Sequence, residues 1–566
     1  MFDLQNKLSG ICEAEMKKKF GISTTIHFSF SLDKGRGDLT TSAALSLAKQ
    51  LKQSPQDVAK TIAQALKSVD GVENVSIAGP GFVNVMLAPA TLSGELPSTL
   101  LVCSPQKNTK KTSPVIIDYS APNVAKPLGI HHILSTVIGQ SLANLYRHLG
   151  FDTVSINHLG DWGTQFGKLA VAYERWGTKK VEEHSIDELL ALYVKFHDEL
   201  ATDASLETEG RAAFAKLEQG DTTLREFWKS VVGITMRSLD HLYERLHIHF
   251  DHTHGESFYE DKMATIVKEG KKKGVFLPGE GGGLIVRFPE TDKLPTLIAL
   301  KADGSTIYLT RDLATARYRI DTWHPQSILY VVDVAQQLYF KQLFATLGQL
   351  GWELPHLEHV LFGRMRFADK DMSTRKGNIL KLEAALDEAL LRAKTIISER
   401  GEKIQTDDPD GLAEMMGVGA LVYGILSQNR KMDMVFDWKK MLSFEGNSAP
   451  YLQYTHARAK SVLRKGGEEH PALTVATSLS PAERRLTKLL LMFGQTLEDA
   501  RKDHLPHKLT NYLYDVCQAF NAFYNSDDIL GASAEQRAFR LGVTSLTARV
   551  LKTGAEILTL RVPDRM

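Results

Sequence analysis

The sequence has few cysteines, almost no net charge and no long apolar run, and each absence excludes a class of protein. Its three cysteines, at positions 12, 103 and 517, lie far apart and include no Cys-x-x-Cys pair. They argue against a structural zinc site or a disulfide framework and fit a reducing cytoplasm. No apolar run reaches the roughly 18 residues that a membrane span needs, and the charged N-terminus lacks the apolar centre of a signal peptide. We expect a soluble cytoplasmic protein that holds no metal of its own.

The charge balance and the length limit the organisation of the chain. Its 68 basic and 67 acidic side chains leave a formal net charge of +1. Overall charge therefore gives no sign of a nucleic-acid partner, and any such surface must be a local patch. One hydrophobic core rarely grows beyond about 250–300 residues. A chain of 566 residues is therefore expected to form several domains, and we predict three.

Residues 1–103 are predicted to form a small N-terminal α/β domain. They begin with a helical pattern and end in an alternating strand at Val83, Val85 and Leu87, directly after the turn residues Gly79-Pro80-Gly81. The stretch 104–114 is polar, basic and bounded by prolines, which predicts a linker.

Residues 115–405 carry the alternation of strand and helix that is typical of a Rossmann-type parallel sheet. Val115 to Ile117 form an apolar run of the buried-strand type, apolar residues recur at helical spacing from Ile130 to Leu145, and a second strand follows at Val154 and Ile156. The alternation returns over 328–362, with its last strand near 359–362.

The remaining parts of the chain read as helical. We predict a mostly helical insertion at about 170–300, inside the α/β domain, and an all-α bundle over 406–566, where strand signals vanish. The predicted fold is therefore a Rossmann-type α/β domain with helical insertions, preceded by a small α/β domain and followed by a helical bundle.

Two motifs lie at strand ends, where open α/β sheets bind ligands. The stretch 118–127 (DYSAPNVAKP) offers free amide groups and a helix start that suit phosphate, while Asp118 and Asn123 can hold a cationic amino group. Taken alone, it is equally well explained as a helix cap and turn. The stretch 372–378 (MSTRKGN) is a basic loop before a helix that begins near Leu382, and its cations can stabilise charge on a transferring phosphate. Taken alone, it is better explained as a solvated loop.

Together and in this order, these motifs resemble those of arginyl-tRNA synthetases, and the likeness covers essentially the whole chain. SAPNVAKP with the histidines after it resembles the family's form of the class I ATP signature, and MSTRKGN resembles the second class I signature. Four more stretches carry the resemblance: NHLGDWGTQFG (157–167), IYLTRDLA (307–314), GNSAPYLQYTHAR (446–458) and VPDRM (562–566).

The resemblance implies an arginine–tRNA ligase that forms arginyl adenylate from arginine and ATP and transfers arginine to tRNA(Arg), releasing AMP and pyrophosphate. Carboxylates and a phenol oxygen match the planar N–H fork of a guanidinium, and lysine would leave acceptors unpaired. Each unpaired acceptor costs about 1–3 kcal/mol, so two would reject lysine by roughly a hundredfold. The implied arginine-binding residues are Asp118, Asn123, Tyr308, Asp312 and Gln336.

The resemblance also implies an ATP site whose only metal is the Mg²⁺ that travels with ATP, in a chain that acts as a monomer. The implied ATP-binding residues are Gly129, His131, His132, Met372, Ser373, Thr374, Arg375 and Lys376. Among the catalytic residues we place His132, Lys126, Arg375 and Lys376.

One departure from the family pattern stands in the first signature. The family usually has His-x-Gly-His where this chain has Gly129-Ile130-His131-His132, so a donor is lost and bulk is added where adenine is expected to lie. Three interpretations remain: a lineage variant in which His131 turns aside or stacks on adenine, a slow enzyme, or a noncatalytic tRNA-binding paralogue. We favour the first. Another class I synthetase is disfavoured by Asp118 and Asp312 and by the lack of zinc cysteines and of a recognisable editing domain.

Contacts with tRNA are expected at both ends of the chain. The N-terminal domain resembles the family's tRNA-elbow domain, with Asn84 as its candidate contact, although a polar residue on the open face of an edge strand explains Asn84 equally well. The bundle resembles the anticodon-binding domain, where Tyr451 and Tyr454 can stack on bases, although packing between helices better explains either tyrosine taken alone. Arg458 can meet phosphate, and Met566 lies in the family's closing motif.

Two other patterns are not assigned a function. His247, His249, His252 and His254 resemble a metal cluster, and the alternation would put 247 and 249 on one strand face, but no second pair of ligands closes a site. Gly281-Gly282-Gly283 lacks the lysine of a phosphate-binding loop and is predicted to be a hairpin turn.

Overall fold

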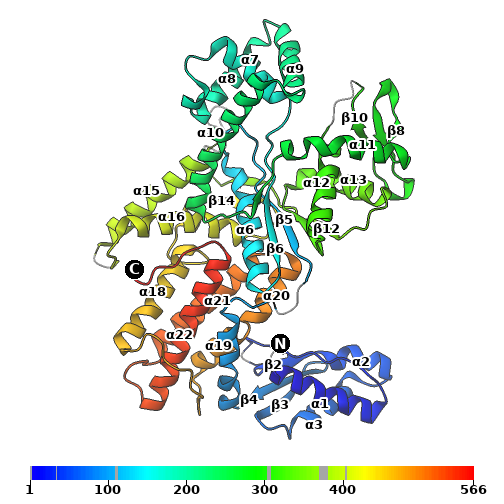
Figure 1. Ribbon diagram of the computed structural model, residues 1–566. Coiled ribbons are helices and arrows are strands. Elements are labelled where there is room, and N and C mark those ends of the chain that lie inside the picture. The colour runs from blue at the N-terminus through cyan, green and yellow to red at the C-terminus, as the bar shows by residue number, and fades with distance from the viewer. Residues whose placement is uncertain (1–2, 34, 109–111, 303–306, 369–379, 402–403) are drawn as a thin grey trace.

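A computed structural model describes residues 3–33, 35–108, 112–302, 307–368, 380–401 and 404–566. In Figure 1 the N-terminal domain lies at the opposite end of the molecule from the helices α7 (Thr164–Trp176), α8 (Ile186–Glu199) and α9 (Ser205–Glu218). The parallel sheet lies between them, and the C-terminal bundle extends down to lie beside the N-terminal domain. Among the described residues, no helix is long and apolar enough to cross a membrane.

The N-terminal domain packs helices on an antiparallel sheet of four strands in the order β1-β2-β4-β3. The strands are β1 (Ser29–Phe30), β2 (Leu39–Thr41), β3 (Val72–Ala78) and β4 (Phe82–Leu87), and the helices are α1 (Asp3–Phe20), α2 (Ala43–Leu51) and α3 (Pro55–Leu66). Val83, Val85 and Leu87 are buried, as their alternation predicts. However, β4 pairs with both β2 and β3. It is therefore an inner strand and not an edge strand.

The central sheet is parallel throughout, with five strands in the order β12-β11-β5-β6-β7. They are β5 (Val115–Asp118), β6 (Thr153–Asn157), β7 (His252–Thr253), β11 (Ser327–Tyr330) and β12 (His356–His359). Helix α6 (Ile133–His148) joins β5 to β6, and α13 (Gln337–Gln349) joins β11 to β12. The strand expected near 359–362 begins earlier. After it the chain continues beside β11 through single hydrogen bonds, for example from Val360 N to Tyr330 O at 2.8 Å.

The insertion has a helical half and a half that contains a small sheet, and Figure 1 shows them as separate lobes. The first half holds α7, α8, α9 and the long helix α10 (Thr222–Leu246). The second holds α11 (Met263–Lys272) and the antiparallel strands β8 (Leu277–Pro278), β9 (Leu284–Val286) and β10 (Leu297–Leu300), and α12 (Tyr308–Trp323) follows. Gly281 and Gly282 adopt positive φ between β8 and β9, which confirms the hairpin.

The prediction that His247 and His249 share one face of a strand is wrong. His247 ends α10 in a left-handed conformation with φ 55°, so 247 and 249 do not share a strand face. The imidazole of His254 stacks on Phe258 at 4.2 Å instead. Among the described residues, no group of three or more His, Cys, Asp or Glu could hold a metal ion.

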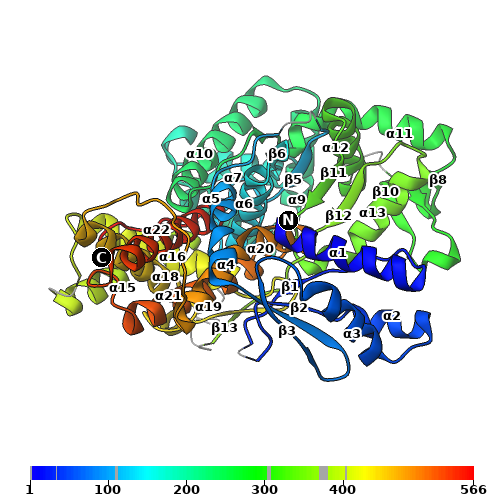
Figure 2. The same ribbon diagram turned by 90° about the horizontal axis from the view of Figure 1, so that it is seen from below.

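The C-terminal part is helical and lies beside the N-terminal domain (Figure 2). A short strand, β14 (Met434–Phe436), was not expected there, and it pairs with β13 (Met365–Phe367). The larger helices are α15 (Leu382–Arg400), α16 (Pro409–Leu426), α18 (Ala449–Gly466), α19 (Pro481–Leu491), α20 (Phe493–Asp503), α21 (His507–Ser526) and α22 (Ala534–Ile557).

Candidate active site

The ligand-facing edge of the parallel sheet is built around Asp118, the last residue of β5. The apolar residues before it bury the strand, which leaves Asp118 at the carboxyl edge with 6% of its surface exposed. Its Oδ2 lies 2.7 Å from a guanidinium nitrogen of Arg319, a fully buried residue of α12. Burial alone would lower the pKa of Arg319, but the Asp118 carboxylate, together with the hydroxyls of Tyr259 and Tyr330, outweighs this effect and raises the pKa. Asp118 therefore already neutralises an arginine of the chain itself.

Asp312 is the second acidic group at this edge and also lies on α12. It accepts a hydrogen bond from the hydroxyl of Tyr339 on α13. Burial raises the pKa of Asp312 and outweighs the opposing effects of His158 and Tyr339. In the described part of the chain, Asp312 forms no ion pair. It is therefore the acidic group that can still pair with a cationic ligand.

Tyr308 and Asn123 are held at the surface of the site. Tyr308 opens α12, is 70% exposed and has the guanidinium of Arg311 5.8 Å from its ring centroid. Asn123 pairs with Gly160 through a backbone bridge, and a Cβ atom at Gly160 would collide with the Asn123 carboxamide oxygen. The loop 160–167 therefore needs glycine at its first position so that Asn123 can approach.

The chain between β5 and the histidines is strained. Ser120, Ala121 and Ala125 have φ of 71°, 48° and 64°, although none of them is glycine. A residue other than glycine in this region costs on the order of 1–3 kcal/mol, so the surrounding structure must hold it in place. We call residues 119–129 the substrate loop.

The substrate loop ends in a single turn of 3₁₀ helix, Ile130–His132. His132 folds back on this turn, because its Nδ1 accepts a hydrogen bond from the Gly129 amide at 3.0 Å. The same Nδ1 also lies 3.1 Å from the carbonyl oxygen of Gly129, and in the tautomer in which Nδ1 is the acceptor the ring proton is on Nε2. Burial, together with the neighbouring His131, lowers the pKa of His132 to about 4. His132 is thus neutral at physiological pH and offers an N–H donor.

Two cavities meet at this turn, and both histidines line both of them. One of about 720 Å³ is also lined by Asn123, Lys126 and Gly129. The other, of about 660 Å³, is also lined by Gln336. The rings of His131 and His132 lie 4.0 Å apart. The structure therefore brings six of the predicted site residues together around the turn.

The second signature, with Met372, Ser373, Thr374, Arg375 and Lys376, lies outside the described residues. The chain that follows it touches the histidine turn directly: Ile130 N donates to Leu380 O at 2.8 Å, and Gly129 forms a bridge with Lys381.

The residues expected to contact tRNA differ in exposure. Asn84 is only 2% exposed, and its Oδ1 accepts a hydrogen bond from Thr40 Oγ1 at 2.8 Å. Asn84 lies on the face of β4 opposite to Val83 and Val85 and is covered there, so its contact with tRNA stays a prediction. In the bundle, Tyr454, Arg458 and Met566 line one cavity of about 620 Å³. Tyr451 is half-buried beside it, and its hydroxyl accepts a hydrogen bond from Asn521 at 3.0 Å.

Comparison with known proteins identifies the family. A model described as "tRNA synthetases class I (R), catalytic domain" matches residues 95–438. The "Arginyl tRNA synthetase N terminal domain" matches 4–87, and the "DALR anticodon binding domain" matches 452–566. A curated arginine–tRNA ligase of Fusobacterium nucleatum subsp. nucleatum is 38% identical over 96% of this chain and 95% of its own length. The chain belongs to the arginyl-tRNA synthetase family.

Further matches agree with this arginyl-tRNA synthetase assignment. The arginine–tRNA ligase of Alkaliphilus metalliredigens is 38% identical over 92% of both chains. Arginyl-tRNA synthetases of Plasmodium falciparum and Thermus thermophilus share the fold, with TM-scores of 0.81 and 0.80 at 23% and 22% identity, and each comparison covers 100% of both chains. The predicted family and fold class are therefore confirmed.

Several residues of the site in this arginyl-tRNA synthetase were not found from the sequence. Arg319 lies seven positions after Asp312, a spacing that puts both on one helix face, and this was its only signal. Tyr339, which donates to Asp312, has no local signal, because its position depends on how α12 and α13 pack.

Proposed function

We propose that this chain attaches arginine to tRNA(Arg) in two steps, first forming arginyl adenylate from arginine and ATP. The observation that carries the proposal is Asp312, a carboxylate held by Tyr339 and without an ion-pair partner among the described residues, beside the neutralised pair of Asp118 and Arg319. The identity of 38% to curated arginine–tRNA ligases supports it.

Arginine would bind with its guanidinium on Asp312. The planar fork of donors can make two parallel hydrogen bonds to one carboxylate, which a lysine ammonium cannot do. Asp118 would supply the oxygens that Arg319 leaves unused, and Tyr308 would close the site from the exposed side. Asn123 and Gln336, which line the two cavities that meet at the histidine turn, would take the α-amino and α-carboxyl groups.

ATP would bind in the cavity of about 660 Å³ that Gln336 and the two histidines line. Nε2–H of His132 would donate to a phosphate oxygen, while Lys126 and, from the undescribed segment, Arg375 and Lys376 would stabilise charge on the leaving pyrophosphate. Gly129 cannot supply the side-chain donor that the family usually has there. His131 remains near it, is exposed and would contact adenine or a phosphate. Mg²⁺ would arrive with the nucleotide and be held by its phosphates.

The tRNA would be read in the bundle by Tyr451, Tyr454, Arg458 and Met566, which lie in or beside one cavity. Arg458 packs its guanidinium over the rings of Tyr454 and Tyr524, at 4.7 and 5.0 Å. Such a stack can extend onto an unpaired base, and base stacking on an aromatic ring is worth about 1–3 kcal/mol. We expect a cytoplasmic monomer, and light scattering at micromolar concentration would test the oligomeric state.

The test is charging of tRNA(Arg) by the purified chain with ATP, Mg²⁺ and labelled arginine, with lysine as the competing amino acid. We expect charging with arginine and at least about a hundredfold lower efficiency with lysine. Tight tRNA binding without charging would overturn the proposal and leave the noncatalytic paralogue. Charging with an amino acid other than arginine would point to another class I synthetase.

A further inference from the structure

Helix α10 of the insertion contacts the substrate loop from a side that the proposed function does not use. Tyr243, 4% exposed, places its hydroxyl 2.8 Å from Ser120 Oγ. The same hydroxyl accepts a hydrogen bond from Asn157 Nδ2 at 3.2 Å. Burial raises the pKa of Tyr243 to about 12, so the hydroxyl keeps its proton.

The direction of each hydrogen bond in this group follows from counting donors. Thr136 Oγ1 donates to the carbonyl of His132 at 3.0 Å, so toward Ser120, 2.9 Å away, it can only accept. The Ser120 hydroxyl therefore donates to Thr136 and accepts from Tyr243. The result is one ordered chain, from Asn157 through Tyr243, Ser120 and Thr136 to the backbone of His132.

Each strained residue of the substrate loop has its amide fixed by a side chain. Ser120 N donates to Ser135 Oγ at 2.9 Å, and Ala121 N donates to Asn157 Oδ1 at 3.2 Å. Ala125 N donates to Thr235 Oγ1 of α10 at 3.1 Å. Thr235 and Tyr243 are eight positions apart, which places both on the side of α10 that faces the loop. One helix therefore holds the substrate loop near both ends of its strained part.

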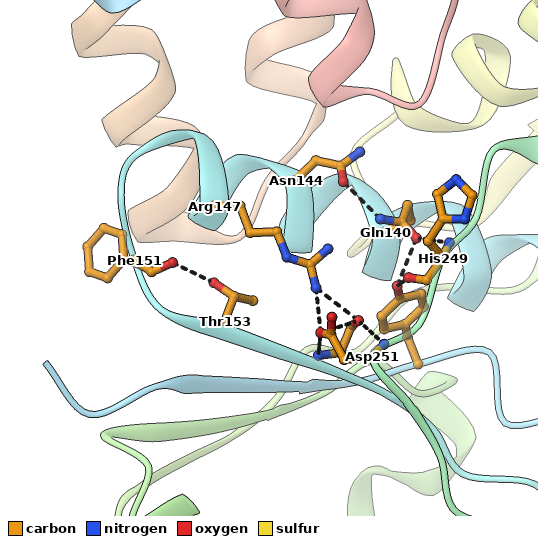
Figure 3. A network of polar contacts seen from close by, with 9 residues as sticks. Gln140, Asn144, Arg147, Phe151, Thr153, His249 and Asp251 are labelled. Carbon is orange, nitrogen blue, oxygen red and sulfur yellow. Dashed lines mark hydrogen bonds and ion pairs between the residues drawn. The ribbon is translucent and has the colours of Figure 1, made fainter. Parts of the chain in front are cut away.

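Helix α10 is itself firmly fixed where it ends. Arg245 pairs with Asp387 and Glu414, of α15 and α16, each at 2.8 Å. The chain after the helix is tied to α6: Figure 3 shows His249 beside Gln140, where the His249 amide donates to Oε1 at 2.7 Å. It also shows Arg147 paired with Asp251, at 2.6 Å. The position of Tyr243 is therefore set by the catalytic domain and by the helices that lead to the bundle.

We propose that Tyr243, with Thr235, is a positioning residue that holds the strained substrate loop in the conformation needed for adenylate formation. This rests on the proposed function, because the loop carries Asn123 and leads into His132. Tyr243 does not touch the reactants; it acts through Ser120 and the His132 backbone. The strain in the loop makes such support necessary, since without it the loop would relax.

The test compares Tyr243→Phe with Tyr173→Phe, since each removes one tyrosine hydroxyl. The hydroxyl of Tyr173 donates to the carbonyl of Lys179 at 3.0 Å, within the insertion and away from the substrate loop. In arginine-dependent ATP–pyrophosphate exchange with tRNA present, Tyr243→Phe should lower kcat by about tenfold or more. KM values for arginine and ATP, tRNA affinity and Tm should stay close to those of Tyr173→Phe. At the second contact, Thr235→Val should lower kcat, and Thr235→Ser, which keeps the hydroxyl, should restore it.

A double variant separates positioning from a loss of packing. Glycine adopts φ near 48° without strain, so Ala121→Gly in the Tyr243→Phe background should recover part of the lost kcat. It should recover none in the Tyr173→Phe background. Equal kcat for the two phenylalanine variants, or a loss of kcat that follows Tm without rescue, would overturn this inference. An unmodified chain that fails to activate arginine would instead overturn the proposed function.

Discussion

At the residue scale, the ionisable groups of the site have their charge set by close partners. Asp118 is balanced by Arg319, Asp312 is held by a neutral phenol, and His132 is kept neutral by burial and by the neighbouring His131. These three arrangements give a site with one carboxylate prepared for a cation and one N–H donor prepared for phosphate.

Asp312→Asn should impair arginine binding far more strongly than a matched substitution elsewhere on the same helix. The substitution keeps the size of the side chain but removes the charge and one acceptor, so KM for arginine should rise by about a hundredfold. Steady-state charging assays would measure it. The control is Asp321→Asn on the same helix, where an exposed pair with Arg317 is lost and KM should not change. If the two variants had equal KM, Asp312 would not be the guanidinium partner.

His132 predicts a pH dependence of stability. Its pKa is about 4 in the folded chain and 6.5 in its ordinary state. As the pH falls, His132 therefore takes up its proton in the unfolded chain before it does so in the folded chain. The free energy of unfolding is unaffected by His132 above pH 6.5 and decreases as the pH falls from 6.5 toward 4. The loss is at most about 3 kcal/mol. Urea unfolding at pH 7.5 and 5 should show a smaller loss for His132→Gln than for the unmodified chain. A larger loss in the variant would contradict this.

Individual contacts in the site could be predicted only where a motif carried them. Asp312 and His132 stand in recognisable stretches, but Arg319, Tyr339 and Tyr243 reach the site from helices that are far apart in sequence. Asn84 shows the opposite case, since its motif was recognised but its burial depends on β4 lying inside the sheet.

At the element scale, α15 and α16 pack closely because small residues face each other. Ala389 and Ala393 of α15 and Ala413 of α16 are fully buried. A Cβ atom on Gly417 would lie 2.8 Å from the backbone of Ala389. Helix α15 begins a few residues after the second signature, so this close packing fixes the position of the helix that follows the signature.

Gly417→Ala should therefore destabilise the chain, although alanine is the better helix former. The methyl group meets backbone that cannot move without separating the helices, and such overpacking costs about 1–3 kcal/mol. The matched control is Gly233→Ala on α10, where the nearest atom is the far end of Arg237 at 3.8 Å. That change should stabilise by about 0.5–1 kcal/mol. Thermal unfolding that moved in the same direction for both variants would contradict the packing argument.

Periodicity predicted the long elements well and the short ones poorly. The helix near 133–148 has a strong apolar pattern and forms as expected. The three-residue strand β14 has too few residues for a pattern, and β12 was expected later because the chain stays beside β11 after the strand ends. The histidine alternation failed because a left-handed residue closes α10 there.

At the scale of the whole molecule, the N-terminal domain is held on the bundle by a buried charge. Asp38 is fully buried and lies 2.6 Å from Arg484 and 3.6 Å from Lys488, both on α19. It also accepts the backbone amide of Leu87 at 2.9 Å. Burial lowers the pKa of Lys488, and Asp38 opposes that fall. The Asp38 carboxylate thus joins the end of strand β4 to helix α19 of the bundle.

Asp38→Ala should release this domain without altering the catalytic sheet. Removing one member of a buried ion pair costs about 3–5 kcal/mol. Here Lys488 would stay buried with only the carbonyl groups of Ser31 and Gly37 as partners, while Arg484 would keep Glu73 at 3.7 Å. The first unfolding transition should move to lower temperature, and proteases should cut more readily near residues 88–103. If the N-terminal domain binds tRNA, as the family resemblance implies, KM for tRNA should rise while kcat at saturating tRNA is retained. Asp33→Ala is the control, since it removes only an exposed pair with Arg36 in the same loop.

If Asp38→Ala matched this control in both Tm and KM for tRNA, the buried carboxylate would not hold the two domains together. A lower Tm with an unchanged KM for tRNA would confirm that Asp38 holds the two domains together, but would show that their relative position does not affect tRNA binding.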